Sequence, residues 1–228
     1  MVAHDPGCNE RQVSYPDFLL PAVLWYFSRM KKEQRKRIID KHRDSLTRHG
    51  HHPNALYWSS REIQEIRFRV LAEIGIKSAD SVLDVGCGFG DFSSWFETDG
   101  KNLNFSGVDI SPDLIREAEH LHPDARFYCG ELSDFRFETG SFDWVILSGA
   151  MNEQLFDDGD YARRQIALMY ELCRKGLAFN MLDARHLRAH DLQSVDPGQM
   201  LDYCKTLCPA AALHDDYLAN DFTIYMLR

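Results

Sequence analysis

From residue 81 to residue 92 the chain reads Ser81-Val82-Leu83-Asp84-Val85-Gly86-Cys87-Gly88-Phe89-Gly90-Asp91-Phe92. The stretch begins as an apolar run that contains one carboxylate, and three alternate glycines then interrupt it. Aromatic side chains return at helical spacing at Phe92, Trp95 and Phe96. This order predicts a buried strand, a tight loop and the start of a helix.

The glycines suggest a ligand-binding loop. Gly86, Gly88 and Gly90 can adopt positive φ, and they leave no Cβ between the backbone and a ligand. Backbone N–H groups at the start of a helix favour an anionic group. Glycine-rich loops also occur as ordinary turns, so the loop alone does not identify a ligand.

Asp84 distinguishes between two classes of ligand. It stands two residues before the first glycine. A carboxylate there would repel the pyrophosphate of NAD, because like charges repel strongly in a low dielectric. S-adenosylmethionine has no phosphate and carries an ammonium and a cationic sulfur. Asp84 therefore favours S-adenosylmethionine over NAD.

A second acid follows the next predicted strand, which covers residues 104–108 and is followed by Asp109. Nucleotide-binding βαβ units place a carboxylate on the ribose hydroxyls about 20 residues after the glycine loop. Ser111 and Pro112 then open a helix, with proline in its first turn. The sequence thus predicts Asp109 as a ribose ligand.

Both stretches resemble known motifs. The run Asp84-Val85-Gly86-Cys87-Gly88-Phe89-Gly90 resembles the first motif of the class I S-adenosylmethionine-dependent methyltransferases, and residues 105–112 resemble the second. The resemblance covers about residues 57–228. It implies an α/β fold with a doubly wound, mostly parallel seven-stranded sheet. The predicted strands 211–217 and 222–227 resemble the antiparallel last strand of that sheet.

The resemblance also implies a set of cofactor-binding residues. These are Arg67, Asp84, Gly86, Cys87, Gly88, Asp109, Ile110, Glu131, Leu132, Ser148 and Gly149. The family often has Gly-Asp where this chain has Gly130 and Glu131, and the acid there meets the adenine. Glu131 is one methylene longer, which puts its contact with the adenine amine in doubt.

Arg67 lies on a predicted helix that begins at Ser59, forms a capping box with Glu62, and ends at Gly75. The core face of this helix is predicted to be Ile63, Ile66, Val70 and Ile74. In relatives an arginine at this point often reaches the carboxylate of the cofactor, and we expect this of Arg67. The alternative is a surface salt bridge to Glu62 or Glu65, which would stabilise little.

Catalytic candidates come from the loops after the parallel strands, where such sheets bind ligands. Asn152 follows the fourth predicted strand and His186 follows the fifth. A single histidine is also commonly an ordinary surface residue. The chain lacks an Asn-Pro-Pro-aromatic sequence after the fourth strand, which argues against the DNA methyltransferases that modify amino groups.

Composition bounds the architecture. With 228 residues and 44% hydrophobic content, the chain can bury one sizeable core. We expect an N-terminal helical cap over residues 1–56 and a cofactor-binding domain over residues 57–228. No run approaches the roughly 20 apolar residues that span a bilayer. The N-terminus shows no secretion pattern, so we expect a cytoplasmic protein without a membrane partner.

Charge is distributed unevenly along the chain. The net charge of −9 argues against extensive binding of nucleic acid. Residues 29–48, however, hold nine Lys or Arg and only three acids. This basic stretch is either a solvated helix face or a docking surface for an anionic partner.

No metal is expected. Cys204 and Cys208 lie one helical turn apart, but two ligands do not make a zinc site. The histidines in His49-Gly50-His51-His52-Pro53 lie in a predicted turn without a nearby thiolate or carboxylate. The six cysteines of the chain are expected to be free thiols.

Three functions remain open. The leading one is methyl transfer to a small-molecule acceptor, with the N-terminal helices and Trp25, Tyr26 and Phe27 covering the opening above Asn152. The first alternative is an RNA or carrier-protein methyltransferase that uses residues 29–48, whose binding should weaken steeply with salt. The second is a non-catalytic protein that binds S-adenosylmethionine. The sequence does not indicate an oligomeric state.

Overall fold

The computed structural model describes residues 29–98, 100–157, 159–187 and 191–228. The α-helices of this part are α2 Lys32–His49, α3 Arg61–Ala72, α4 Asp91–Glu97, α5 Pro112–Leu121, α6 Asp160–Leu172 and α7 Pro197–Leu207. The strands are β1 Ser81–Val85, β2 Asn104–Asp109, β3 Arg126–Cys129, β4 Phe142–Ser148, β5 Cys173–Asp183, β6 Ser194–Val195, β7 Ala212–His214 and β8 Asp221–Leu227. Short 3₁₀ helices are η1 Pro53–Leu56, η2 Leu132–Asp134 and η3 Ala150–Asn152.

The strands form one sheet in the order β3-β2-β1-β4-β5-β8-β7, and β6 pairs with β5 beside this path. Strands β1 to β5 run parallel, and β8 runs antiparallel to both β5 and β7. The predicted doubly wound sheet with an antiparallel last strand is confirmed. The topology reverses beside β1, which brings the ends of β1, β2 and β4 together where such folds bind ligands.

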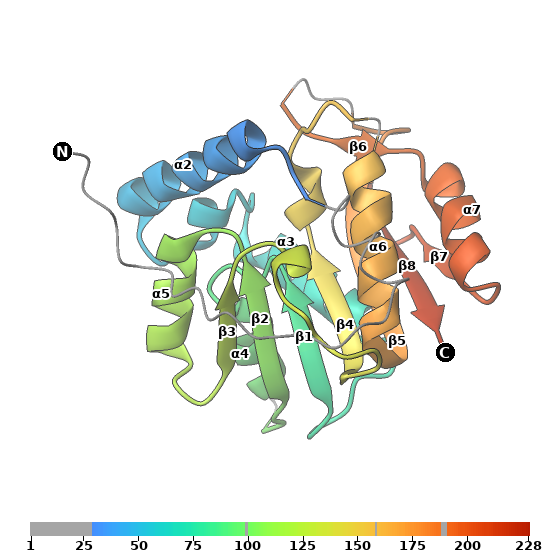
Figure 1. Ribbon diagram of the computed structural model, residues 1–228, viewed down its shortest axis with the longest axis horizontal. Helices are drawn as coiled ribbons and strands as arrows, with labels where there is room; N and C mark the ends of the chain where they lie inside the picture. The colour runs from blue at the N-terminus through green and yellow to red at the C-terminus, as the bar shows by residue number, and fades with distance from the viewer. Residues whose placement is uncertain (1–28, 99, 158, 188–190) are drawn as a thin grey trace.

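Helices cover both faces of the sheet (Figure 1). Alternate residues of a strand point to opposite faces, and in β1 Leu83 joins one core while Val82 joins the other. The first core contains side chains of α6 and α7, such as Ile166 and Met200. The second contains side chains of α3 and α4, such as Phe68. The two-sided burial explains why the strands are nearly continuous apolar runs.

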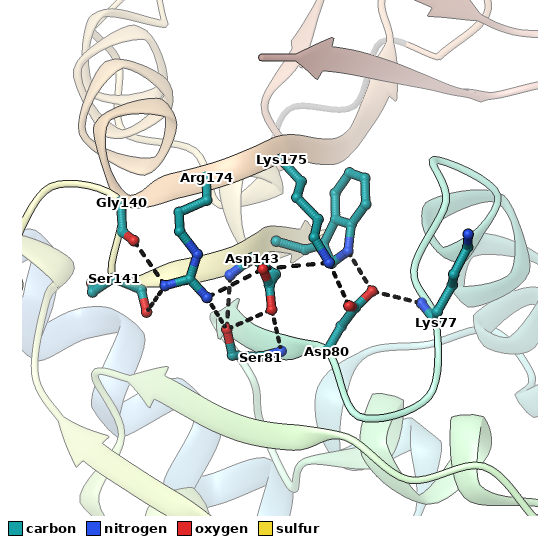
Figure 2. A network of polar contacts seen from close by, with 9 residues as sticks. Lys77, Asp80, Ser81, Gly140, Ser141, Asp143, Arg174 and Lys175 are labelled. Atoms are coloured by element: carbon teal, nitrogen blue, oxygen red, sulfur yellow. Dashed lines mark hydrogen bonds and ion pairs between the residues drawn. The ribbon is translucent and has the colours of Figure 1, made fainter.

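A network of charges ties together the ends of β1, β4 and β5 that lie away from the glycine loop (Figure 2). The Asp143 carboxylate accepts from Ser81 N at 3.0 Å and pairs with Arg174 at 3.1 Å. Lys175 Nζ lies 2.6 Å from Asp80 Oδ1 and 3.4 Å from Asp143 Oδ1. Because the network joins three neighbouring strands at their starts, it stabilises their register.

Helix α3 differs in detail from the prediction. Its N-cap is Ser60, whose side chain accepts from Ile63 N, so the expected cap at Ser59 is wrong. The buried residues of the helix are Gln64, Arg67, Phe68, Val70 and Leu71. The face that carries Gln64 and Arg67 is therefore buried rather than at a boundary, while Ile63 is only half-buried.

Helix α2 crosses the molecule above the ends of the central strands (Figure 1). It ends at His49, where the N–H of Gly50 bonds to Leu46 O as the glycine and proline run predicts. The aromatic cluster at residues 25–27 lies outside the described residues. No helix in the described part is long and apolar enough to cross a membrane.

Candidate functional site

A cavity of about 650 Å³ opens at the C-terminal ends of β1, β2 and β4. Its walls come from α2, η1, α3, the glycine loop and the segments that follow β2, β3, β4 and β5. All eleven predicted cofactor-binding residues and Asn152 line it. His186 does not belong to the lining; it lies on an exposed turn, where its N–H donates to Asp183 O.

The glycine loop uses its N–H groups within the chain. Gly86 N and Cys87 N donate to Val108 O at 2.7 and 3.1 Å. Gly88 N donates to Asp109 Oδ2 at 3.0 Å, and Gly90 N donates to Cys87 O at 2.9 Å. The first three groups hold the loop against β2, and Gly90 N closes a turn within the loop. All four are therefore bonded within the chain and are not free for the anionic group that the sequence favoured.

Two positions of the loop are packed against the rest of the protein. A Cβ on Gly86 would lie 2.2 Å from the Cβ of Ala150, so η3 packs directly on the loop. The Cys87 thiol is turned under β2, 2.6 Å from the position of a Cβ on Gly107. Gly86 therefore allows η3 to pack closely on the loop, and Cys87 faces the cavity with its backbone rather than its thiol.

Asp84 has the features of a site for a cation. Its side chain is 3% exposed, and its Oδ1 finds no hydrogen-bond partner among the described residues. Burial and the charges of Asp109 and Asp91 raise the pKa of Asp84 to about 8. A cationic group beside Asp84 would restore its carboxylate form and satisfy the free oxygen. Gln64 Oε1, also buried without a partner in the described part, adds a second acceptor to the same wall.

Asp109 is held in place by its surroundings. Its Oδ2 accepts from Gly88 N, and its Oδ1 accepts from Ser111 N at 2.9 Å. Burial raises the pKa of Asp109, and the nearby His42 of α2 opposes that rise. Each carboxylate oxygen has room for a further donor, so Asp109 can receive ribose hydroxyls as predicted.

Glu131 is in contact with the N-terminal segment. Its Oε2 accepts from Met30 N at 2.8 Å and from the Tyr161 hydroxyl at 3.2 Å. Arg35 Nη1 lies 3.6 Å from the other oxygen. The Glu131 side chain is 3% exposed, and burial raises its pKa against the effect of Met30 N and Arg35.

Arg67 is buried in the wall beside Gly149. Its Nε donates to Asp221 Oδ2 at 3.0 Å, and its Nη2 pairs with the other oxygen of Asp221. The guanidinium lies 4.8 Å from the ring centre of Trp58, and its Nη1 faces Gly149. The surface alternative for Arg67 is wrong, since the residue is only 6% exposed. Its contact with the carboxylate of the cofactor stays a prediction.

Asn152 acts as a structural link at the end of η3. Its Oδ1 accepts from Leu182 N at 3.2 Å, and its backbone carbonyl accepts from Gln193 N at 2.8 Å. These contacts join η3 to the end of β5 and to the residue before β6. The next residue, Glu153, has one oxygen 2.5 Å from Lys41 Nζ, while its Oε2 is buried without a partner among the described residues.

Three residues of the cavity gave no signal in the sequence analysis. Asp221 partners Arg67 from 154 positions away, and His42 stands inside a basic helix without a motif around it. Tyr161 reaches Glu131 from α6. A search for acids at the start of the predicted last strand would have found Asp221; nothing local distinguishes the other two.

The basic stretch docks on the acids of its own chain. Arg29 and Arg35 pair with Asp134, Lys41 pairs with Glu153, and Arg43 pairs with Asp113. Arg37 donates to the backbone carbonyl of Gln154. Of the two alternatives for this stretch, these residues therefore form a docking surface, and the groups that they contact belong to the same chain.

Sequence comparisons agree with this site. Residues 82–176 match the family described as a methyltransferase domain. A Mycobacterium tuberculosis protein assigned as a methyltransferase is 29% identical over 167 residues, which are 67% of this chain and 97% of that protein. Erythromycin 3″-O-methyltransferase of Saccharopolyspora erythraea is 30% identical over 155 residues, 59% of this chain and 49% of that enzyme, so the match reaches about half its length.

A solved structure shares the fold. Magnesium protoporphyrin IX methyltransferase from Synechocystis, solved with S-adenosylmethionine bound, superposes with a TM-score of 0.55 at 15% identity and covers 72% of this chain and 79% of that chain. By the match over residues 82–176 the chain contains a methyltransferase domain, and it has the fold of the class I S-adenosylmethionine-dependent methyltransferases. It is an enzyme, and its cofactor is S-adenosylmethionine.

The acceptor oxygens of the cavity fit this cofactor. The free oxygens of Asp84 and Gln64 suit its cationic end, and Asp109 suits its ribose. Glu131 and Leu132 line the wall where the adenine is expected. When bound, S-adenosylmethionine supplies a methyl group on a cationic sulfur that leaves readily. The residues of the chain orient the reactants and exclude water.

Proposed function

We propose that this enzyme methylates a small-molecule acceptor by in-line transfer inside the cavity covered by α2. The observation that carries the proposal is this roof, from which Ile38, Lys41 and His42 line the cavity. A volume of about 650 Å³ falls within the range of roughly 300–1,000 Å³ that is typical of small-molecule sites. A roofed cavity of this size favours a compact acceptor over a polymer.

The charges of α2 support the same conclusion. An RNA methyltransferase would need its cations free to neutralise phosphates. Here Arg35, Lys41 and Arg43 are engaged by carboxylates of the same chain. The walls also carry more carboxylates than cations: Asp84, Asp91, Asp109, Glu131, Glu153, Asp191 and Asp221 against Lys41 and Arg67. A cavity with this balance disfavours an anionic acceptor.

Glu153 supports an acceptor that brings a hydrogen-bond donor. Its Oε2 is buried on the cavity wall without a partner in the described part, and leaving such an atom unsatisfied costs about 1–3 kcal/mol. Lys41 already balances its charge at 2.5 Å. A neutral hydroxyl or amine of the acceptor would satisfy Oε2, with Asn152 fixing the segment that carries Glu153.

The chain accelerates the reaction mainly by positioning. Holding the nucleophile and the methyl carbon about 3–3.5 Å apart in line removes most of the entropic part of the barrier. The sulfonium leaves without help, so no covalent protein nucleophile is needed. A general base is required only if the acceptor is protonated at neutral pH, and Glu153 is our candidate.

An acceptor screen tests the proposal. The protein is incubated with S-adenosylmethionine and neutral hydroxyl or amine compounds, and in parallel with total RNA and with a carrier protein; formation of S-adenosylhomocysteine is measured. We expect turnover with small neutral compounds only. Glu153→Gln should lower that turnover at least about 100-fold if Glu153 acts as the base, whereas Glu138→Gln, on the exposed surface, should leave it unchanged.

Other outcomes favour the alternatives. Turnover on RNA that falls steeply between low and moderate salt would replace the small-molecule proposal with a nucleic-acid one. Cofactor binding without turnover on any substrate of the screen would favour the non-catalytic alternative.

A further inference from the structure

The strongest unassigned feature of the cavity is His42 on α2. This residue lines the cavity, and its Nδ1 is buried without a hydrogen-bond partner among the described residues. We propose that His42 is a cofactor-binding residue that contacts the ribose opposite Asp109, so that α2 completes the nucleoside end of the cofactor site. The proposal rests on the cofactor alone and holds for any acceptor.

The position of α2 puts His42 over the end of β2. The adjacent Arg43 donates from Nε to Asp113 Oδ2 at 2.8 Å, and α5, which contains Asp113, begins three residues after Asp109. On the other side, Lys41 is held by Glu153 at 2.5 Å. These two contacts fix the turn of α2 that carries His42 between the segments that follow β2 and β4.

One further contact holds the His42 ring. It packs edge-on against Tyr57 with ring centres 5.6 Å apart. Its charged surroundings are Asp109, Glu153 and Lys41. Burial lowers the pKa of His42, and the two carboxylates oppose this lowering. The lowered pKa favours the neutral imidazole, which has one N–H donor and one acceptor nitrogen.

The chemistry of the ribose fits this arrangement. Two adjacent hydroxyls offer two donors, and each oxygen of Asp109 already accepts one backbone N–H. One hydroxyl can donate to Asp109 while the other donates to the unpartnered nitrogen of His42. If both hydroxyls donated to Asp109, the buried nitrogen of His42 would stay without a hydrogen bond, at a cost of about 1–3 kcal/mol.

The residue expected at the adenine, Glu131, also contacts the segment that leads into α2. Glu131 accepts from Met30 N at 2.8 Å and lies 3.6 Å from Arg35 Nη1. Both acids assigned to the nucleoside therefore face the segment that enters and forms α2. The described part of the cap, residues 29–56, and the cofactor domain over residues 57–228 would then share one nucleoside site.

Calorimetry with two ligands tests the assignment. S-adenosylhomocysteine carries the whole cofactor skeleton, and 5′-methylthioadenosine lacks the amino-acid end. We expect His42→Ala to weaken both by roughly 3- to 10-fold, the effect of one lost hydrogen bond. His42→Asn should retain most of the affinity, because its amide lies near the position of Nδ1. His120→Ala, on the exposed face of α5, is the matched control.

Arg67→Lys should change the two affinities in a different way from His42→Ala. If Arg67 holds the carboxylate of the cofactor, that variant weakens S-adenosylhomocysteine and leaves 5′-methylthioadenosine unchanged. His42→Ala should weaken both, and its effect should vanish with a 2′,3′-dideoxy analogue of 5′-methylthioadenosine. Circular dichroism and thermal unfolding establish that each variant is folded.

Two results would overturn the proposal. Unchanged affinity of folded His42→Ala for both ligands would show that His42 does not contact the nucleoside. An equal loss with 5′-methylthioadenosine and its dideoxy analogue would show that the effect does not pass through the ribose. Neither result would bear on the acceptor screen, so this test and that of the small-molecule proposal fail independently.

Discussion

Arg67 and Asp221 form a buried ion pair that joins α3 to the first residue of β8, across 154 positions of the chain. Arg67 Nε lies 3.0 Å from Asp221 Oδ2, and neither residue is more than 6% exposed. Burial raises the pKa of Asp221, and the charge of Arg67 opposes the rise. The pair fixes one wall of the cavity, and it orients the remaining guanidinium nitrogen towards Gly149.

Removing the charge of Asp221 should destabilise the fold strongly. Asp221→Asn leaves the guanidinium of Arg67 buried without its counter-ion, which typically costs about 3–5 kcal/mol of unfolding free energy. Urea unfolding followed by circular dichroism measures the change. Asp215→Asn removes an exposed partner of Arg185 and should cost less than about 1 kcal/mol. Equal effects of the two substitutions would mean that the buried pair contributes no more than a surface one.

Asp109 should account for a defined part of cofactor affinity. Asp109→Ala is expected to weaken S-adenosylmethionine by about 1–3 kcal/mol through lost hydrogen bonds to the ribose. Calorimetry of the purified protein measures this, with Asp124→Ala as a control on the exposed turn before β3. NAD should not bind the parent protein. Tighter binding of NAD than of S-adenosylmethionine would contradict our assignment of the glycine loop.

Replacing Gly86 with alanine should destabilise the fold more than the same replacement at an unconstrained glycine. Gly86 has φ +77°, and a Cβ there would meet the Cβ of Ala150 at 2.2 Å. Gly100 has a similar φ of +69° with nothing within 4 Å of its Cβ position. Gly100→Ala should cost about 1–2 kcal/mol for the left-handed backbone alone. Gly86→Ala should cost a further 1–3 kcal/mol or so for overpacking. Chemical denaturation of both variants gives the difference, and similar costs would argue against the close contact.

The network at the start of the strands should make stability depend on acid pH. Burial raises the pKa of Asp143, but the N–H of Ser81 and the charge of Arg174 outweigh it and lower the pKa to about 2, from an ordinary value of 3.8. A carboxyl group with a depressed folded-state pKa stabilises the fold above its unfolded pKa, and the stabilisation disappears as pH falls through the folded value. We therefore expect a loss between about pH 4 and pH 2.

Asp143→Asn isolates this contribution. The variant should unfold at lower urea concentration than the parent at pH 7, and the difference between them should shrink as the pH falls from 4 to 2. Asp202→Asn, on the exposed surface of α7, should follow the parent at every pH. A difference that does not change with pH would mean that Asp143 stabilises the fold through packing rather than charge.

The local elements of the fold were predictable from the sequence because their causes are local. Nearly continuous apolar runs mark β1 and β4, alternate glycines mark the loop after β1, and a cap with proline marks the starts of α5 and α7. Spacing also predicted the acids Asp84 and Asp109, since Asp84 stands two residues before the first glycine and Asp109 ends a buried strand. All predicted cofactor residues reached the cavity wall for this reason.

Contacts between distant segments were decided only by the tertiary structure. The use of the loop N–H groups by β2, the pairing of Arg67 with Asp221, and the roof formed by α2 all depend on which surfaces meet after folding. The basic stretch, residues 29–48, shows this best, because its charge pattern is equally consistent with a solvated helix face and with a docking surface. Its true partners, Asp113, Asp134 and Glu153, lie about 70 to 110 positions away. Periodicity and spacing describe a chain over a few turns, whereas an ion pair depends on a fold that brings the two charges together.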